Sequence, residues 1–336
     1  MKFVRTPRSI VQDTMHPEGF HGTGVSGGFF EGWYVKLVSA DQSARWAVIP
    51  GVFRGEDDGE RTDEAFVQVL NGATGESWYH RYPVEDFWAA RGRFDVRVGP
   101  HRFTNRGAEL RFDNLHGDIA YETALDPWPV TWRKPGIMGW YAWVPAMECY
   151  HGVVSFGHDL AGSLTIDGVS VDFTGGRGYI EKDWGRAFPA GYVWMHSAHF
   201  VDTPGVSLVA SVAIIPWLRS AFRGFIVGLR TPDRLRTWAT YNGSKEIDLA
   251  FDDSHVRWSL TGPDGQLELA AERRRGGLLH APVRTRMHER VEETLDSVID
   301  VRLTDEAGQV LIDTKATTAG LEVHGDLDRL LSINQR

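Results

Sequence analysis

The sequence predicts a mainly β protein built as an antiparallel sandwich or barrel. Short stretches of alternating apolar and polar residues recur along all 336 residues. Turn dipeptides such as Asn71-Gly72 and Gly99-Pro100 separate them. Short alternating stretches bounded by Gly, Asn and Pro are typical of antiparallel strands, whereas βαβ units would require long amphipathic helices between the strands.

The N-terminal half begins with an irregular lead-in, predicted from the Gly and Pro content of residues 1–27. The stretch GGFFEGWYVKLVSA, from Gly27, then reads as a strand in which Glu31 and Trp33 share one face and Tyr34 lies on the other. Further strands are expected at residues 45–53, 65–70, 93–98 and 109–112.

An aromatic segment follows, from Asp126 to Leu164, with four tryptophans and four prolines. Because proline interrupts helices, we predict a long loop that leads into a strand at 147–156. A second β series is expected after residue 200, at 206–215, 225–230, 236–241, 247–251, 256–261, 267–271 and 298–303. Short helices are predicted at 217–222 and 286–295.

The central stretch is GGRGYIEKDWGRAFPAGYVWMHSAHF, from Gly175, and we place the boundary between domains 1–174 and 175–336 at its start. Its glycines indicate a turn, and the residues from Tyr192 onward alternate as in a strand. Charged groups beside tryptophan suggest a functional site. The alternative is a bend stabilised by a structural ion pair, in which Lys182 would bind Glu181 or Asp183.

The composition narrows the class of partner. A net charge of -9 argues against a nucleic-acid partner. The 13 Trp, 17 Phe and 9 Tyr indicate either an aromatic β core or a pocket for a hydrophobic small molecule. A single cysteine, Cys149, excludes an intrachain disulfide. We find no signal-peptide pattern and no apolar run long enough for an integral membrane segment, so a cytoplasmic protein is expected.

Two motif classes are discounted, so neither a cofactor nor a metal is predicted. Residues 22–27 satisfy GxGxxG, but no strand precedes them and an aromatic strand follows. His196 and His199 would point to opposite faces of a strand. Cys149, His151 and His158 have no recognised ligand spacing.

Acidic residues lie within the aromatic segments: Glu31, Glu148, Glu181 and Asp183. A carboxyl group surrounded by aromatic side chains loses hydration, which raises its pKa and lets it act as a proton donor near neutral pH. The alternative for each of them is a hydrogen-bonded structural carboxylate.

Three segments resemble the tocopherol cyclase family: FFEGWYVKLV from Phe29, PGIMGWYAWVPAMECYHGVVS from Pro135 and GYIEKDWGRAFPAGYVWMHSAHF from Gly178. A shorter match, AGLEV, begins at Ala319. The resemblance implies two lipocalin-like β domains, as in the similar carotenoid hydratase and AttH-like proteins. It also implies long, unsaturated substrates: prenylated quinols closed to a chromanol without a redox cofactor, hydrated carotenoids, or polyenes folded by cycloaddition.

Addition of a phenol oxygen across an alkene needs a proton donor, a base for the phenol and aromatic faces for the cation. The candidates are Glu148 or Glu31 as acid, His151 or His196 as base, and Asp183 as a further carboxylate. The predicted substrate-contacting residues are Trp33, Tyr34, Trp132, Trp140, Trp184, Trp194 and His199. The leading hypothesis is a cofactor-independent cyclase or isomerase of a prenylated quinol, terpenoid or polyene; the alternatives are a hydratase and a carrier without chemistry.

Overall fold

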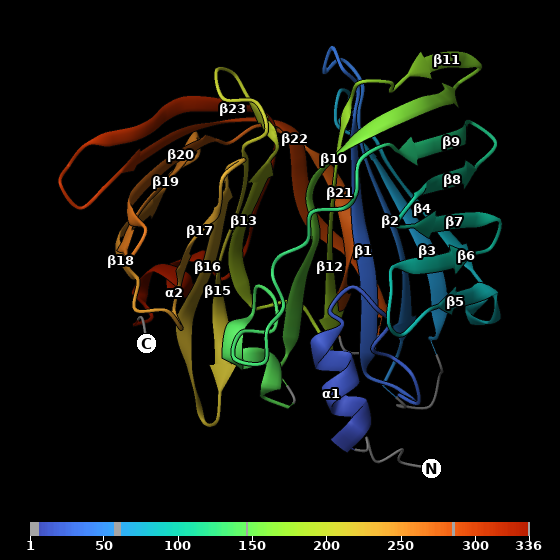
Figure 1. Ribbon diagram of the computed structural model, residues 1–336. Helices are drawn as coiled ribbons and strands as arrows, with labels where there is room; N and C mark the ends of the chain where they lie inside the picture. The colour runs from blue at the N-terminus through green and yellow to red at the C-terminus, as the bar shows by residue number, and fades with distance from the viewer. Residues whose placement is uncertain (1–6, 57–61, 146, 284–285, 335–336) are drawn as a thin grey trace. The chain divides into compact units, whose positions relative to one another are not determined.

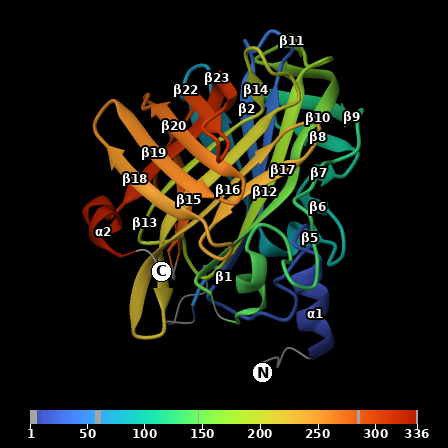
Figure 2. The same cartoon turned by 60° about the vertical axis from the view of Figure 1, so that its left-hand side comes forward.

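The structure is a computed structural model that describes residues 7–56, 62–145, 147–283 and 286–334 (Figures 1 and 2). The described residues are mainly antiparallel strands, and the predicted lipocalin-like β fold class is confirmed. The chain divides into two compact units. The first unit comprises residues 1–71, 76–188 and 279–290, and the second comprises residues 72–75, 189–278 and 291–336.

The first unit contains one large antiparallel sheet. Its strands are β1 (Phe29–Val38), β2 (Arg45–Arg54), β3 (Glu64–Asn71), β4 (Ser77–Tyr82), β5 (Phe87–Ala89), β6 (Asp95–Val98), β7 (His101–Thr104), β8 (Gly107–Arg111), β9 (Leu115–Tyr121), β10 (Cys149–Ile166), β11 (Val169–Asp172) and β12 (Arg177–Gly185). Among the described residues the strand order is β4-β3-β2-β1-β12-β10-β9-β8-β7-β6-β5, and β11 pairs with β10.

One face of this sheet surrounds the core of the first unit. Trp33 and Leu37 of β1 belong to the same buried cluster as Val96 of β6 and Phe103 of β7. Because strands far apart in the sheet order contribute to one core, the sheet must curl around it, as in a nearly closed barrel. Burial of such large apolar side chains is the main stabilising contribution to the unit.

The second unit has its own sheet and core. Its strands are β13 (Gly191–Ser197), β14 (His199–Phe200), β15 (Ser207–Trp217), β16 (Ser220–Arg230), β17 (Leu235–Ala239), β18 (Lys245–Phe251), β19 (His255–Gly262), β20 (Gly265–Glu272), β21 (Gly277–Val283), β22 (Arg286–Thr304) and β23 (Val310–Gly325). In the described chain the order is β17-β16-β15-β13-β23-β22-β20-β19-β18, with β14 on β23 and β21 on β22. Val193, Trp238 and Trp258 lie in its core.

Residues 279–290 of β21 and β22 belong to the first unit. The His280 N–H donates to Gln68 Oε1 at 2.7 Å, and Gln68 Nε2 donates to the His280 carbonyl at 2.9 Å. Met287 packs with Phe30 and Phe66. The helix predicted at 286–295 is therefore wrong, because tertiary pairing and packing override the local pattern there.

Short helices occur elsewhere than predicted. α1 (Pro7–Met15) lies in the expected irregular lead-in, and α2 (Leu327–Ser332) begins after Asp326, whose carboxylate caps the Arg329 N–H at 3.2 Å. Single 3-10 turns are η1 (Val84–Asp86) and η2 (Gly139–Trp143). Within the described ranges, no helix is long and apolar enough to cross a membrane.

Two other sequence-based expectations can be compared with the structure. Residues 217–222, predicted as a helix, end β15 and begin β16, and Leu218 has a left-handed φ of 54° at their turn. The domain boundary after residue 174 stays a prediction. β12 follows that boundary and pairs with both β1 and β10 of the first sheet.

We expect Gly162→Ala to destabilise the first unit. Gly162 has a φ of 107°, and an added Cβ would lie 2.4 Å from the Asp118 carbonyl oxygen of β9. Strain and overlap together should cost about 3 kcal/mol in unfolding free energy. Gly168→Ala is the matched control, because Gly168 has a φ of 81° but no atom within 4 Å of its Cβ position. Gly168→Ala should lower the unfolding free energy by about 1 kcal/mol.

Urea unfolding, followed by tryptophan fluorescence, compares the two variants. Equal losses of stability in Gly162→Ala and Gly168→Ala would contradict the close approach of β9 and β10.

Candidate functional site

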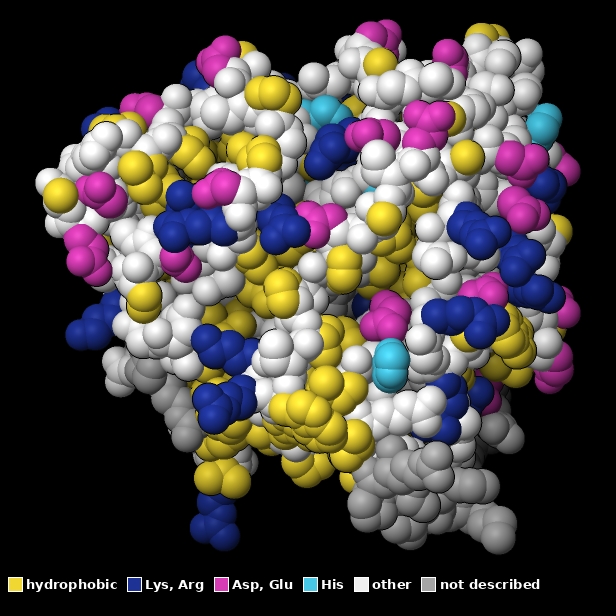
Figure 3. All heavy atoms as spheres, viewed as in Figure 1, with side chains coloured by type: hydrophobic (Ala, Val, Ile, Leu, Met, Phe, Trp, Pro, Cys, Tyr) yellow, Lys and Arg dark blue, Asp and Glu magenta, His cyan; other side chains and the backbone are white. Residues whose placement is uncertain are grey.

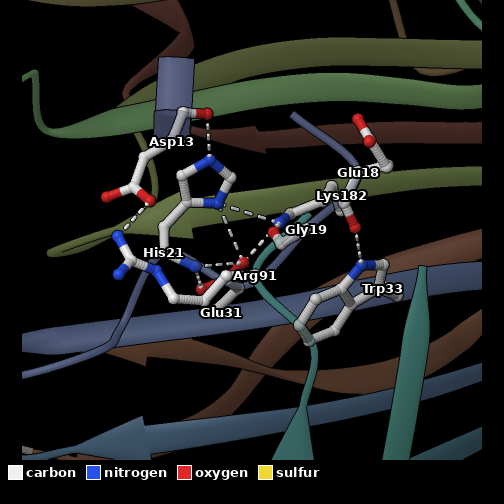
Figure 4. Close-up of polar contacts among 8 residues, drawn as sticks. All are labelled: Asp13, Glu18, Gly19, His21, Glu31, Trp33, Arg91 and Lys182. Atoms are coloured by element: carbon white, nitrogen blue, oxygen red, sulfur yellow. Dashed lines mark hydrogen bonds and ion pairs between the residues drawn. The ribbon is translucent and has the colours of Figure 1, made fainter. Parts of the chain in front are cut away.

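A fully buried ion pair joins β1 to β12. Lys182 Nζ binds Glu31 Oε1, and both side chains are inaccessible to solvent (Figure 4). The register opposes Trp33 to Lys182 and Glu31 to Trp184, so these four side chains lie on the core face of the sheet. The prediction that Lys182 would bind Glu181 or Asp183 is therefore wrong, because strand alternation turns those two carboxylates to the opposite face.

The segment before β1 completes this buried cluster. Lys182 Nζ also donates to the Gly19 carbonyl and lies 3.0 Å from His21 Nδ1. The His21 N–H donates to Glu31 Oε2 at 2.9 Å. His21 Nε2 lies 2.9 Å from the Asp13 carbonyl oxygen, which can only accept. A hydrogen on Nε2 therefore donates to Asp13, and Nδ1 lies between the Lys182 ammonium and Glu31 Oε1, which is 3.1 Å away.

Aromatic rings enclose the ammonium group. Lys182 Nζ lies 4.5 Å from the Trp33 ring centroid and 4.7 Å from that of Trp184. Trp184 stacks on His21 at 4.1 Å and on Tyr150 at 5.4 Å. Since cation–π contact needs a ring face close to the cation, the faces of Trp33 and Trp184 already serve Lys182.

The electrostatics of Glu31 oppose its predicted role as the acid. Burial alone would raise the pKa of Glu31, but the charge of Lys182 and the hydrogen bonds from His21 and Lys182 outweigh it and hold the pKa below its usual value. Burial and the charge of Lys182 lower the pKa of His21, in agreement with a neutral ring. An ionised, fully hydrogen-bonded carboxylate is not a proton donor.

A second polar group lies on the opposite face of the same strands. His151 of β10 is held between two carboxylates of β12, with Nδ1 2.9 Å from Asp183 Oδ1 and Nε2 3.3 Å from Glu181 Oε2. We call His151, Asp183 and Glu181 the histidine clamp. The β10–β12 register, which opposes His151 to Asp183, positions it.

Neighbouring groups extend the clamp at both ends. The Tyr179 hydroxyl donates to Glu181 Oε2 at 2.5 Å, and burial together with the Glu181 charge raises the pKa of Tyr179. Cys149 Sγ lies 3.8 Å from Asp183 Oδ1, and burial and the Asp183 charge raise the pKa of that thiol. Asp183, with 29% of its side chain exposed, is the most accessible member of the clamp.

The clamp carries a proton at neutral pH. Burial would lower the pKa of His151, but the charges of Asp183 and Glu181 and their hydrogen bonds outweigh it and raise the pKa to about 10. The ring is therefore an imidazolium between two acceptors. Such a group can store a proton and pass it along the hydrogen bond from Nδ1 to Asp183.

A metal ion is the competing interpretation, since His151, Glu181 and Asp183 each offer a ligand atom and these atoms lie within 4.8 Å of one another. The two ring nitrogens, however, face different carboxylates. The geometry favours a shared proton, and the absence of a metal stays a prediction.

The remaining predicted residues of the first unit lie in three environments. Tyr34 is buried and opposes Glu181 in the β1–β12 register. Glu148 is half-buried and directly precedes β10. Trp132 and Trp140 are exposed. The structure thus brings Tyr34 to the clamp and leaves Trp132 and Trp140 at the surface.

Three predicted residues belong to the second unit. Trp194 and His196 share one face of β13, are both buried, and have ring centroids 6.4 Å apart. His196 Nε2 lies 3.5 Å from Ser207 Oγ. His199 is half-buried on β14. The structure brings Trp194 and His196 together, and their roles stay predictions.

Sequence reasoning missed His21 and Tyr179 and the position of Glu181 beside His151. Alternation along GYIEKDWG was the available signal, because it places Tyr179, Glu181 and Asp183 on one face and Lys182 on the other. No local pattern identified His21, which reaches the site from the segment after α1.

The fold and the clamp define a lipocalin-like β protein with a histidine–carboxylate site. The tocopherol cyclase-like family model matches residues 101–325, more than half of the chain, and the chain belongs to that family. This confirms the predicted resemblance and supports an enzyme of the cyclase type.

Known proteins agree with this assignment. The chain is 22% identical over 383 aligned residues to a probable chloroplastic tocopherol cyclase of Oryza sativa subsp. japonica, and the match covers 96% of this chain and 81% of that protein. A putative AttH from Nitrosomonas europaea superposes with a TM-score of 0.51 at 12% identity, covering 91% and 95% of the two chains. Kievitone hydratase from Nectria haematococca gives 0.52 at 12% identity, covering 95% and 93%. Both likenesses show the fold.

We expect Lys182→Met to destabilise the protein by about 3–5 kcal/mol, because it leaves the buried Glu31 carboxylate without its cation. The double variant Lys182→Met/Glu31→Gln should recover part of this loss, since the amide carries no charge. Lys315→Met is the control: Lys315 binds Asp300 in an exposed ion pair, and its loss should leave stability unchanged.

Unfolding midpoints in urea measure all three variants. If Lys182→Met unfolded at the same urea concentration as Lys315→Met, the buried Lys182–Glu31 pair would not be a main source of stability.

Proposed function

We propose that the protein is a cofactor-independent cyclase of a hydrophobic, unsaturated small molecule, and that the histidine clamp transfers the proton. The observation that supports this most directly is the position of His151 between Asp183 and Glu181, whose charges raise its pKa. A proton held between two acceptors supplies both an acid and a base within one group, which is what addition across an alkene requires.

The proton balance closes without an outside reagent. The clamp gives a proton to the less substituted carbon of a trisubstituted alkene, and the π electrons form the new C–H bond. The substrate's hydroxyl oxygen attacks the resulting tertiary cation and forms the C–O bond. The hydroxyl proton then passes to the carboxylate of Asp183, the most accessible member, and through His151 restores the clamp. The product has the mass of the substrate.

The surroundings of the clamp suit an oily substrate. A buried apolar cluster of the first unit contains Phe30, Phe53, Phe66 and Met287, and Cys149 packs against it. Cys149 is also the neighbour of Asp183. Apolar walls beside a charged group strengthen its electrostatic effect and exclude competing water.

The predicted roles are redistributed by this proposal. Asp183 replaces Glu31 as the carboxylate that faces the substrate, and Tyr34, opposite Glu181, is proposed to contact it. Trp33 and Trp184 hold Lys182. Glu148 stays an alternative donor, and Trp194, His196 and His199 of the second unit stay proposed substrate-contacting residues.

Hydration is the second candidate, because kievitone hydratase has a similar fold. In that case a water molecule captures the cation, and the product gains one water. A carrier would return the ligand unchanged. Incubation with prenylated quinols and linear polyenes, followed by extraction and mass spectrometry, separates the three.

We expect His151→Gln and Asp183→Asn each to lower turnover at least about 100-fold, since each removes a member of the proton relay. The control is His116→Gln, because His116 is exposed on β9 of the same unit. Product formed from the same panel of quinols and polyenes measures turnover, and far-UV circular dichroism checks folding. Full turnover in both folded clamp variants would exclude the clamp as the catalytic group.

The titration of His151 provides an independent prediction. Its folded pKa, about 10, lies above its unfolded value. Proton-linked stability is therefore complete below about pH 6.5 and is lost as the pH rises through about 10. NMR of the imidazole ring should show this titration near pH 10, and Asp183→Asn should move it downward. A His151 titration near pH 6.5 in the parent protein would contradict the imidazolium assignment.

A further inference from the structure

We propose that the segment around η2 is a docking surface for an anionic lipid bilayer. Its side chains are Trp132, Trp140 and Trp143, which we call the tryptophan patch, together with Arg133 and Lys134. Trp132 is 65% exposed and Trp140 43% exposed. Figure 3 shows hydrophobic side chains gathered on the surface over this segment. Tryptophan is normally well buried in a folded protein, so two exposed ones in one segment require an explanation.

The patch is built on ordered backbone. The Thr131 N–H donates to the Lys134 carbonyl at 3.1 Å, the Lys134 N–H donates to Thr131 Oγ1 at 3.1 Å, and Val130 and Pro135 form a β-bridge. Trp132 stacks on Trp143 with centroids 5.6 Å apart and an angle of 5°. The turn therefore holds the Trp132 ring outward in a fixed position. Because the ring is already ordered, its insertion into a lipid bilayer costs little conformational entropy.

The segment that carries the patch is basic, whereas the chain as a whole is acidic. The protein carries a formal charge of -9, but no Asp or Glu occurs between Asp126 and Glu148. Arg133 and Lys134, both exposed, lie next to Trp132. Tryptophan prefers the interface between lipid and water, and neighbouring basic groups bind anionic headgroups.

The second unit has a similar feature of its own. At the turn between β15 and β16, Leu218 is 96% exposed and has a φ of 54°. Trp217 precedes it and the exposed Arg219 follows. An apolar residue held at a hairpin tip beside a cation is a second element of the kind that enters a headgroup layer.

A second copy of the chain fits the patch less well than a bilayer. A two-fold symmetric dimer places the same surface patch on both subunits. The Arg133 and Lys134 cations of both subunits would then lie in one interface, and like charges at an interface are unfavourable. Phospholipid headgroups instead supply the missing negative charge.

Vesicle sedimentation tests the proposal and requires no substrate. The protein should sediment with phosphatidylcholine vesicles that contain phosphatidylglycerol, and less with phosphatidylcholine alone or at high salt. Trp132→Ser/Trp140→Ser and Arg133→Glu/Lys134→Glu should each weaken binding about tenfold or more. Trp88→Ser is the matched control, because Trp88 is 47% exposed beside Arg97 in the same unit.

The possible results distinguish a lipid bilayer from a second copy of the chain as the partner of the tryptophan patch. No sedimentation with anionic vesicles, or unchanged binding in both patch variants, would overturn the proposal. Self-association that is abolished by Trp132→Ser/Trp140→Ser, without vesicle binding, would assign the patch to a second copy. Because vesicle binding needs no turnover, failure here leaves the proposed cyclase activity intact, and loss of turnover in clamp variants leaves lipid binding intact.

Discussion

The buried pair of Lys182 and Glu31 is the interaction on which the arrangement of the first unit depends. Two charged groups without access to water are tolerated only when each is paired and hydrogen-bonded. Lys182 Nζ directs its contacts to Glu31, Gly19 and His21, which leaves it no other orientation. The pair therefore fixes the register of β1 against β12 more strictly than the surrounding apolar side chains could, because apolar contacts tolerate small shifts.

That register determines the opposite face of β12. Since successive side chains of a strand point to opposite faces, an inward Lys182 requires Glu181 and Asp183 to point away from the core. β10, which pairs with β12 on its other side, then brings His151 between them. The charged sequence Glu-Lys-Asp thus serves two separate purposes: its lysine stabilises the core, and its two acids hold the histidine.

The sequence was sufficient for the β class and for the shared face of Glu31 and Trp33, because alternation is local information. It was insufficient for the partner of Lys182. Glu31 lies on another strand far along the chain, and two acids adjacent in sequence are the more obvious partners. The α1 helix and His21 were also missed, since the segment before β1 is ordered by contacts such as Arg91 with Asp13. Such long-range contacts cannot be predicted from local helix propensity.

The Lys182–Glu31 pair and the histidine clamp differ in their ability to release a proton. Around Glu31, both carboxylate oxygens accept hydrogen bonds and the paired Lys182 lies against the rings of Trp33 and Trp184, so the carboxylate is held in its ionised form. Around His151, a raised pKa is combined with an accessible carboxylate, Asp183. A proton that is tightly held in the resting protein must be released during the reaction. An apolar substrate that displaces water from Asp183 would favour this release, because a desolvated carboxylate binds a proton more strongly. Substrate binding would then move the proton from His151 toward the reacting carbon.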